Sequence, residues 1–87
     1  MKSFEYTIKD EIGIHARPAG MLIKEAARFS SDIKITNVKT EKETDAKKLF
    51  GVMGLAVKCG DTVRITIEGI DEEEAQKSLE EFFKNNL

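Results

Sequence analysis

Histidine, proline and cysteine each occur only once in the 87-residue sequence. The single cysteine, Cys59, has no partner for an internal disulfide, and we expect it to be a reduced thiol of a cytoplasmic protein. One histidine and one cysteine far apart in the sequence also lack the spacing of metal ligands. The sequence therefore predicts no metal site and no cofactor.

Neither sign of charge dominates, because 14 basic and 16 acidic residues leave a net charge of −2. This balance gives no reason to expect nucleic acid or an anionic membrane as a partner. No apolar run approaches the length of a signal-peptide core or a membrane span, so we expect no direct membrane insertion and a cytoplasmic location. A hydrophobic fraction of 40% and a charged fraction of 34% argue against disorder, and residues 1–87 fit a single domain with a thin core.

The histidine, the proline and an arginine all lie within residues 13–19, Gly-Ile-His-Ala-Arg-Pro-Ala. Apolar residues recur at helical spacing from there on, at Ala19, Leu22, Ile23, Ala26 and Ala27, and predict a helix over residues 16–29. His15 then stands at the entry to this helix. Pro18 is tolerated in the first turn because amides there have no intrahelical acceptor.

The start of a helix suits an anion such as a phosphate, because unpaired amides and the positive end of the helix dipole meet there. Arg17 adds a planar fork of charged donors. A nucleophilic imidazole beside such a site indicates a histidine that carries a phosphoryl group. Two alternatives remain open: His15 is a surface or capping residue, or it belongs to a Ser-His-Asp hydrolase, whose site normally needs a larger scaffold.

Alternating and helical patterns along the rest of the chain predict the order β-α-β-β-α-β-α. We expect strands at residues 4–9, 33–36, 43–44 and 63–67, and helices at residues 16–29, 46–53 and after 71. Asp71 and Glu74 resemble a capping box for the last helix, whose buried stripe is Ala75, Leu79, Phe82 and Phe83. This order predicts an α+β fold in which helices cover one face of a four-stranded, mainly antiparallel sheet.

The predicted middle helix, capped by Asp45, is short and marginal, because Gly51 inside it costs about 1 kcal/mol relative to Ala. Its apolar residues, Leu49, Phe50, Val52 and Met53, cover too wide an arc for all of them to face the core. Either the helix is packed on both sides, or part of it is an exposed apolar patch for partners.

Residues 13–19 are similar to the active-site motif of the histidine-containing phosphocarrier protein (HPr) family of the bacterial sugar phosphotransferase system. A second family-like segment, Lys-Lys-Leu-Phe-Gly-Val-Met-Gly-Leu, stands at residues 47–55. The length and the order of elements also agree, so that the resemblance covers essentially the whole chain. It implies an open-faced β-sandwich with three helices on one face of the sheet.

The resemblance also implies a reaction. Enzyme I, itself phosphorylated by phosphoenolpyruvate, passes the phosphoryl group to Nδ1 of His15, which then passes it to the enzyme IIA domains of sugar-specific transporters. The amides of Ala16 and Arg17 and the Arg17 guanidinium bind the phosphoryl oxygens. The protein is then a monomeric phosphocarrier with a phosphohistidine intermediate, not a classical turnover enzyme.

Members of the family dock their partners with the first helix and the short middle helix. Carried onto this chain, the implied contacts are Gly20, Lys24, Leu49, Phe50 and Met53. This favours the exposed-patch interpretation for the middle helix and leaves Val52 as its core residue. The interface is expected to be transient and of modest area.

Three residues depart from the family pattern. Lys48 stands where many members have a regulatory serine that a kinase phosphorylates, so control through that site is in doubt. Ile12 occupies a place that is often small and polar, which questions the side-chain support of the His15 loop. Ala56 replaces a frequent glycine and costs stability if its φ is positive.

Two other functions are compatible with these motifs. The chain could be an HPr-like paralogue that acts mainly as a regulatory protein-binding module, an alternative kept open by Lys48. It could also be a structural or ligand-binding module in which His15 is incidental, which the two motifs together disfavour.

Overall fold

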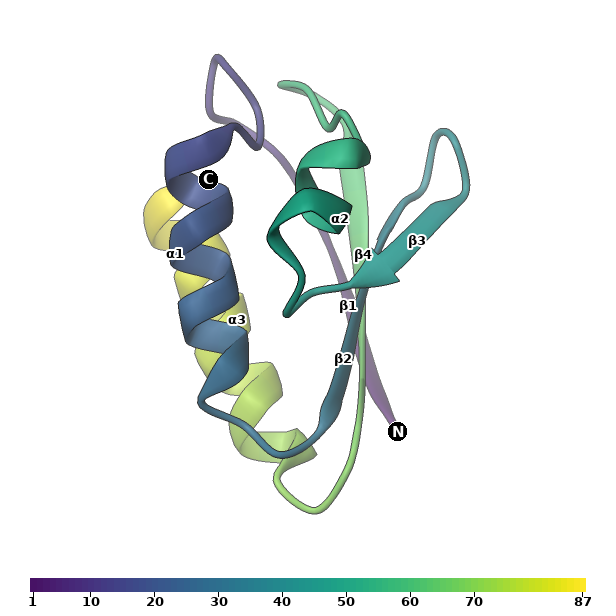
Figure 1. Cartoon of the computed structure of the whole chain (residues 1–87), viewed down its shortest axis with the longest axis vertical. Helices are drawn as coiled ribbons and strands as arrows, with labels where there is room; N and C mark the ends of the chain where they lie inside the picture. The colour runs from purple at the N-terminus through teal and green to yellow at the C-terminus, as the bar shows by residue number, and fades with distance from the viewer.

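The chain folds into four strands and three helices, and the computed structural model describes all of residues 1–87 (Figure 1). In order, the elements are β1 (Lys2–Thr7), α1 (Ala16–Ala27), β2 (Asp32–Asn37), β3 (Lys42–Asp45), α2 (Leu49–Gly54), β4 (Thr62–Glu68) and α3 (Glu72–Asn86). This confirms the predicted order β-α-β-β-α-β-α. None of the three helices combines the length and apolar character that a membrane crossing requires.

The strands form one antiparallel sheet in the order β1-β4-β2-β3. Their alternating pattern gives the sheet one apolar and one polar face. On the apolar face, Ile65 in β4 pairs with Phe4 in β1 on one side and with Ile35 in β2 on the other. On the polar face, Arg64 forms an ion pair with Glu5 at 3.0 Å. The sheet is therefore open to solvent on one side.

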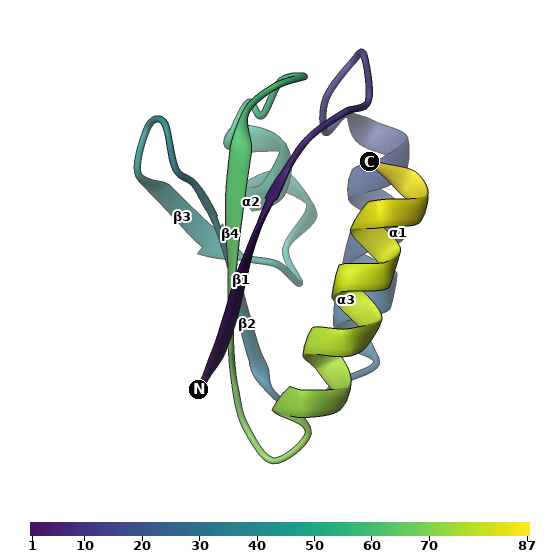
Figure 2. The same ribbon diagram turned by 180° about the vertical axis from the view of Figure 1, so that it is seen from behind.

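All three helices cover the apolar face, with α1 and α3 side by side in both views (Figures 1 and 2). The expected stripe of α3 is buried, and the Phe83 ring packs 5.5 Å from the Tyr6 ring between centroids. In α1, Ala19, Leu22 and Ala26 are buried, whereas Ala27 ends the helix and is exposed. The buried apolar residues form a single core cluster of 20.

The predicted start of α2 is wrong: the helix begins at Leu49, not at residue 46. Asp45 does not cap it, because this residue ends β3 and its carboxylate accepts the amide of Lys47 at 2.8 Å. The amide of Ala46 donates to the carbonyl of Ile33 in β2 at 2.9 Å, so the chain is still bonded to the sheet at this residue and the helix begins later.

The predicted capping box of α3 is also wrong. Asp71 does precede the helix, but its carboxylate accepts the amides of Ser30 and Ser31, at 2.8 and 2.9 Å, and the Ser31 hydroxyl. The carboxylate that accepts a hydrogen bond from the preceding turn is that of Glu72, which binds the amide of Gly69, and not that of Glu74. A contact distant in sequence has thus replaced the local cap.

Candidate functional site

His15 stands immediately before α1, in an extended conformation with φ −108° and ψ −173°. Its carbonyl accepts the first helical hydrogen bond, from the amide of Ala19 at 2.9 Å. Its side chain makes no capping hydrogen bond. His15 therefore occupies the N-cap position of α1, but its half-buried imidazole does not cap the helix and is left for other partners.

Two amides at the start of α1, those of Ala16 and Arg17, have no acceptor within the chain. The next position, Pro18, has no amide hydrogen and is buried. No acidic residue lies in the first turn, so nothing there offsets the positive end of the helix dipole. This end of the helix therefore presents two parallel donors beside the histidine.

The loop before His15 is held against the turn that follows α2. Gly13 has a φ of +84°, and a Cβ on it would overlap the carbonyl oxygen of Val57 and lie 2.7 Å from the Cα of Lys58. The amide of Ile14 donates to the same Val57 carbonyl at 3.1 Å. Only glycine can make this close approach, which fixes where the chain enters α1.

An open hollow of about 310 Å³ lies at this point and is lined by Asp10, His15, Arg17, Pro18, Met21 and Asn86. His15 and Arg17 thus share one cavity, as the motif predicts. Sequence reasoning missed three other lining residues, Asp10, Met21 and Asn86. Met21 could have been found, since it lies one helical turn after Arg17, but Asp10 and Asn86 reach the cavity from the loop after β1 and from the end of α3.

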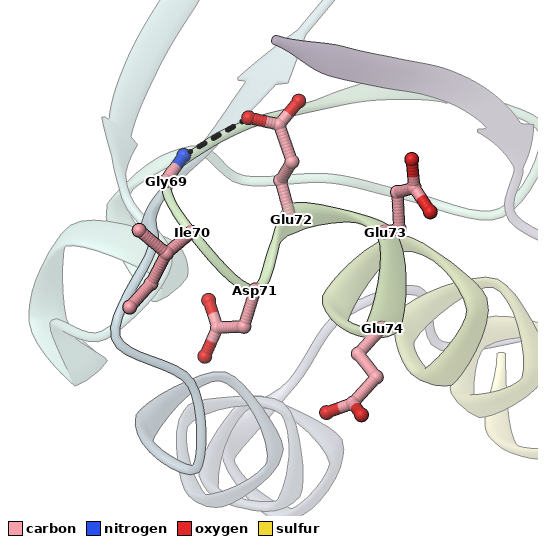
Figure 3. A pocket seen from close by; sticks show the side chains of 6 residues that line it. All are labelled: Gly69, Ile70, Asp71, Glu72, Glu73 and Glu74. Carbon is pink, nitrogen blue, oxygen red and sulfur yellow. Dashed lines mark hydrogen bonds between the residues drawn. The ribbon is translucent and has the colours of Figure 1, made fainter.

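The largest hollow in the molecule, about 590 Å³, lies elsewhere (Figure 3). It surrounds the start of α3 and is lined by Gly69, Ile70, Asp71, Glu72, Glu73 and Glu74. Since α3 runs from here to the His15 cavity, the two hollows are separated by roughly 20 Å of helix. Four carboxylates repel phosphate, so we do not place phosphoryl chemistry there.

Two carboxylates of this acidic hollow have altered proton affinity. The Ser31 hydroxyl and the amide of Ser30 lower the pKa of Asp71. The chain's amino group and the amide of Gly69 lower the pKa of Glu72. Each group is held by donors that prefer the ionised form, which makes it a structural acceptor in the turn before α3.

Helix α2 exposes an apolar patch next to α1. Phe50 is 84% exposed, Leu49 and Met53 are each nearly 40% exposed, and Val52 is fully buried. Helix α1 packs against α2, and on it Lys24 is exposed and Gly20 is half-buried. The expected exposure of Leu49 and Phe50 and the expected burial of Val52 are both confirmed.

The three departures from the family pattern have distinct structural outcomes. Lys48 is exposed and immediately precedes α2, and it makes no capping bond. Ile12 is 64% exposed. Ala56 has a φ of +51°, so the strain expected of alanine at this position is present.

Comparisons with known proteins agree with this geometry. A family model described as the PTS HPr component phosphorylation site matches residues 2–85. The phosphocarrier protein HPr of Mycoplasma genitalium is 37% identical over 86 residues, which cover 99% of this chain and 97% of that protein. The HPr-like protein Crh of Halalkalibacterium halodurans is 40% identical over 77 residues, which cover 88% of this chain and 89% of that protein.

A solved structure of a mycoplasma histidine-containing phosphocarrier protein has the same fold, with a TM-score of 0.91 and 36% identity. The match covers 97% of this chain and 93% of the solved one. The family model, the relatives and the solved structure each extend over nearly the whole chain. The chain therefore belongs to the HPr phosphocarrier family of the phosphotransferase system.

Proposed function

We propose that this chain accepts a phosphoryl group from phospho-enzyme I on His15 and passes it to sugar-specific enzyme IIA domains. The observation that carries the proposal is the placement of His15 in one open cavity with Arg17, directly before two amides that have no acceptor. The role of each residue follows from this arrangement and from membership of the HPr family.

In the first transfer, neutral His15 attacks the phosphorus through the lone pair of Nδ1. The bond between phosphorus and the histidine nitrogen of enzyme I breaks, and its electron pair returns to that nitrogen. Because the transition state is loose, placement and charge stabilisation supply most of the catalysis. The amides of Ala16 and Arg17 bind phosphoryl oxygens, and the Arg17 guanidinium neutralises their charge.

The second transfer repeats the same displacement in the opposite direction, with an acceptor histidine of the enzyme IIA domain as nucleophile. The acceptor must approach His15 in line with the bond that breaks, which an open cavity permits. No residue from another chain is needed to complete this site, and we propose that the working unit is a cytoplasmic monomer.

We assign docking of both enzymes to the patch on α1 and α2 that comprises Gly20, Lys24, Leu49, Phe50 and Met53. Its exposed apolar side chains support this assignment, since partners can cover them without disturbing the core. Such an interface is small enough to release the partner after each transfer.

The decisive experiment is incubation with enzyme I and phosphoenolpyruvate, followed by intact mass and phosphorus NMR. We expect an acid-labile phosphoryl group on the natural sequence and none on the His15→Ala variant. A folded natural protein that stays unphosphorylated would refute the carrier role.

A second candidate function is regulation by protein binding without phosphotransfer. It is favoured by Lys48, which cannot be phosphorylated where many members carry serine, and by the similarity to an HPr-like protein. The two functions differ in their use of His15. A regulatory module keeps its partner in the His15→Ala variant, whereas a carrier loses its function.

A further inference from the structure

The turn that leads into the active site is organised around Asp10. The Asp10 amide donates to the backbone oxygen of Leu87 at 2.9 Å, and its carbonyl accepts the amide of Gly13 at 3.0 Å. Its side-chain oxygen Oδ1 accepts the amide of Ile12 at 2.9 Å. One residue thus bonds to both the end of α3 and the inside of the turn.

The Oδ1 bond is the only one that a side chain of residues 10–13 makes to the backbone of this turn. The backbone is anchored on either side, by the bond to Leu87 before the turn and by the bond from Ile14 to Val57 after it. Between these anchors, the side chain of Ile12 offers no hydrogen-bonding atom. Between these two anchors, the side chain of Asp10 is therefore the one that restrains the backbone of the turn.

The same side chain also lines the cavity that holds His15 and Arg17. Its charge cannot favour an incoming phosphoryl group, because both are anions. The structure gives this carboxylate a second way to act, the hydrogen bond by which Oδ1 holds the Ile12 amide. Two properties of this carboxylate must therefore be distinguished: the position of its acceptor oxygen relative to the backbone, and its negative charge.

We propose that Asp10 is a positioning residue for phosphoryl transfer, which orients His15 in the cavity by holding the amide of Ile12. This inference rests on the proposed carrier function. It also explains how the His15 loop is supported although residue 12 is an apolar isoleucine.

Three variants separate the position of the acceptor oxygen from the charge of the side chain. Asp10→Asn keeps the acceptor oxygen at the same distance from the backbone and removes the charge. Asp10→Glu keeps the charge but is too long for this turn, in which Asp and Asn are the favoured residues. Asp10→Ala removes both. All three change a partly exposed loop residue outside the core.

The measurement is the rate of phosphoryl transfer from phospho-enzyme I, resolved into kcat and KM. We expect kcat to fall about tenfold in Asp10→Ala and Asp10→Glu and to stay within about twofold of the natural value in Asp10→Asn. KM should change little, since the docking patch is untouched. A reversed order, with Asp10→Glu active and Asp10→Asn impaired, would show that charge matters and overturn the proposal.

Two measurements without enzyme I test the turn itself. Hydrogen exchange of the Ile12 amide should be faster, and the imidazole NMR signals of His15 displaced, in Asp10→Ala but not in Asp10→Asn. Unchanged spectra in Asp10→Ala would contradict the proposal, even if that variant proved too unstable for kinetics. Failure of the natural sequence to be phosphorylated would instead refute the carrier function, so the two failures are distinguishable.

Discussion

Gly51 illustrates how a contact can overrule the helix propensity of a residue. It lies inside α2, where alanine would ordinarily be favoured by about 1 kcal/mol. A Cβ at this position would overlap the Thr44 hydroxyl and lie 3.2 Å from the Cβ of Thr44. The sequence shows the glycine as a weakness of α2, whereas the structure shows it as a requirement for packing on β3.

We expect Gly51→Ala to lower the free energy of unfolding by about 1–3 kcal/mol, because the added methyl group overpacks this contact. Urea unfolding monitored by circular dichroism measures the change. Gly20→Ala is the matched control: it lies inside α1 with no atom within 4 Å of the added carbon, and should stabilise by about 1 kcal/mol. A stabilising Gly51→Ala would disprove the clash.

Ala56 gives a prediction of opposite sign. Because its φ is +51° and its side chain is exposed, Ala56→Gly should relieve strain without loss of packing. We expect the free energy of unfolding to rise by about 0.5–1 kcal/mol in the same urea assay. The same change at exposed Ala27, at the end of α1, should instead destabilise. Equal effects at the two sites would contradict the argument.

The active site was only partly predictable at the level of residues. That His15 and Arg17 share one cavity is predictable, because they lie in one short segment at a helix start, where both charge and backbone geometry can be inferred. Asn86 is not predictable in this way, because it meets the site only after α3 has packed beside α1, and for Asp10 the sequence indicates a turn but not that its side chain lines the cavity. Folding brings together residues that no local pattern connects.

Helix α2 depends on its surroundings more than the other elements do. Its six residues are too few for a helix to be stable alone. Val52 is its only buried residue, whereas Phe50 is almost wholly exposed. The helix thus has one buried side chain that packs on the core and exposed side chains that form the patch proposed for docking.

This arrangement predicts different outcomes for two substitutions. Val52→Ala should lower the free energy of unfolding by about 2 kcal/mol, through lost burial and a cavity. Phe50→Ser should change it by less than about 0.5 kcal/mol and raise KM for phospho-enzyme I. Denaturation and transfer kinetics on the same samples measure both. If Phe50→Ser transferred normally, the docking patch would be misplaced.

The elements themselves were predictable where the pattern is long, although the predicted end of α1, at residue 29, lies two residues beyond the observed end at Ala27. The apolar stripes of α1 and α3 and the alternation in β4 extend over several turns or pairs, and these elements were found. The start of α2 and the cap of α3 each depend on one carboxylate. Asp45 and Asp71 bond elsewhere in the folded chain, which no local rule reveals.

At the scale of the whole molecule, the ends of all three helices are joined around the buried Ser31. Asp71, before α3, accepts the amide and hydroxyl of Ser31. Lys47, before α2, donates to the carbonyls of Ser31 and Phe29, at 2.9 and 2.8 Å. This polar junction lies at the opposite end of α1 from His15 and ties the helices to the start of β2.

The junction predicts how stability depends on pH. Since the folded state lowers the pKa of Asp71, the unfolded chain binds this proton more readily. The stabilisation is therefore complete well above about pH 4, the ordinary range of an aspartate, and is lost as the pH falls through the lower folded pKa.

Urea unfolding between neutral and strongly acidic pH measures this effect. Asp71→Asn should be less stable than the natural sequence at neutral pH, and the difference should shrink on acidification. A constant gap between Asp71→Asn and the natural sequence would refute the argument.

The two amides that precede Pro18 have a consequence for the evolution of this chain. A donor that belongs to the backbone is encoded by no particular amino acid, so changes of side chain at residue 16 leave it in place, with proline as the exception. Selection can then change the side chains that surround the histidine without removing these two amide donors. Under the proposed function, a lineage can acquire new partners by point mutation while the same main-chain atoms stay available to the transferred group.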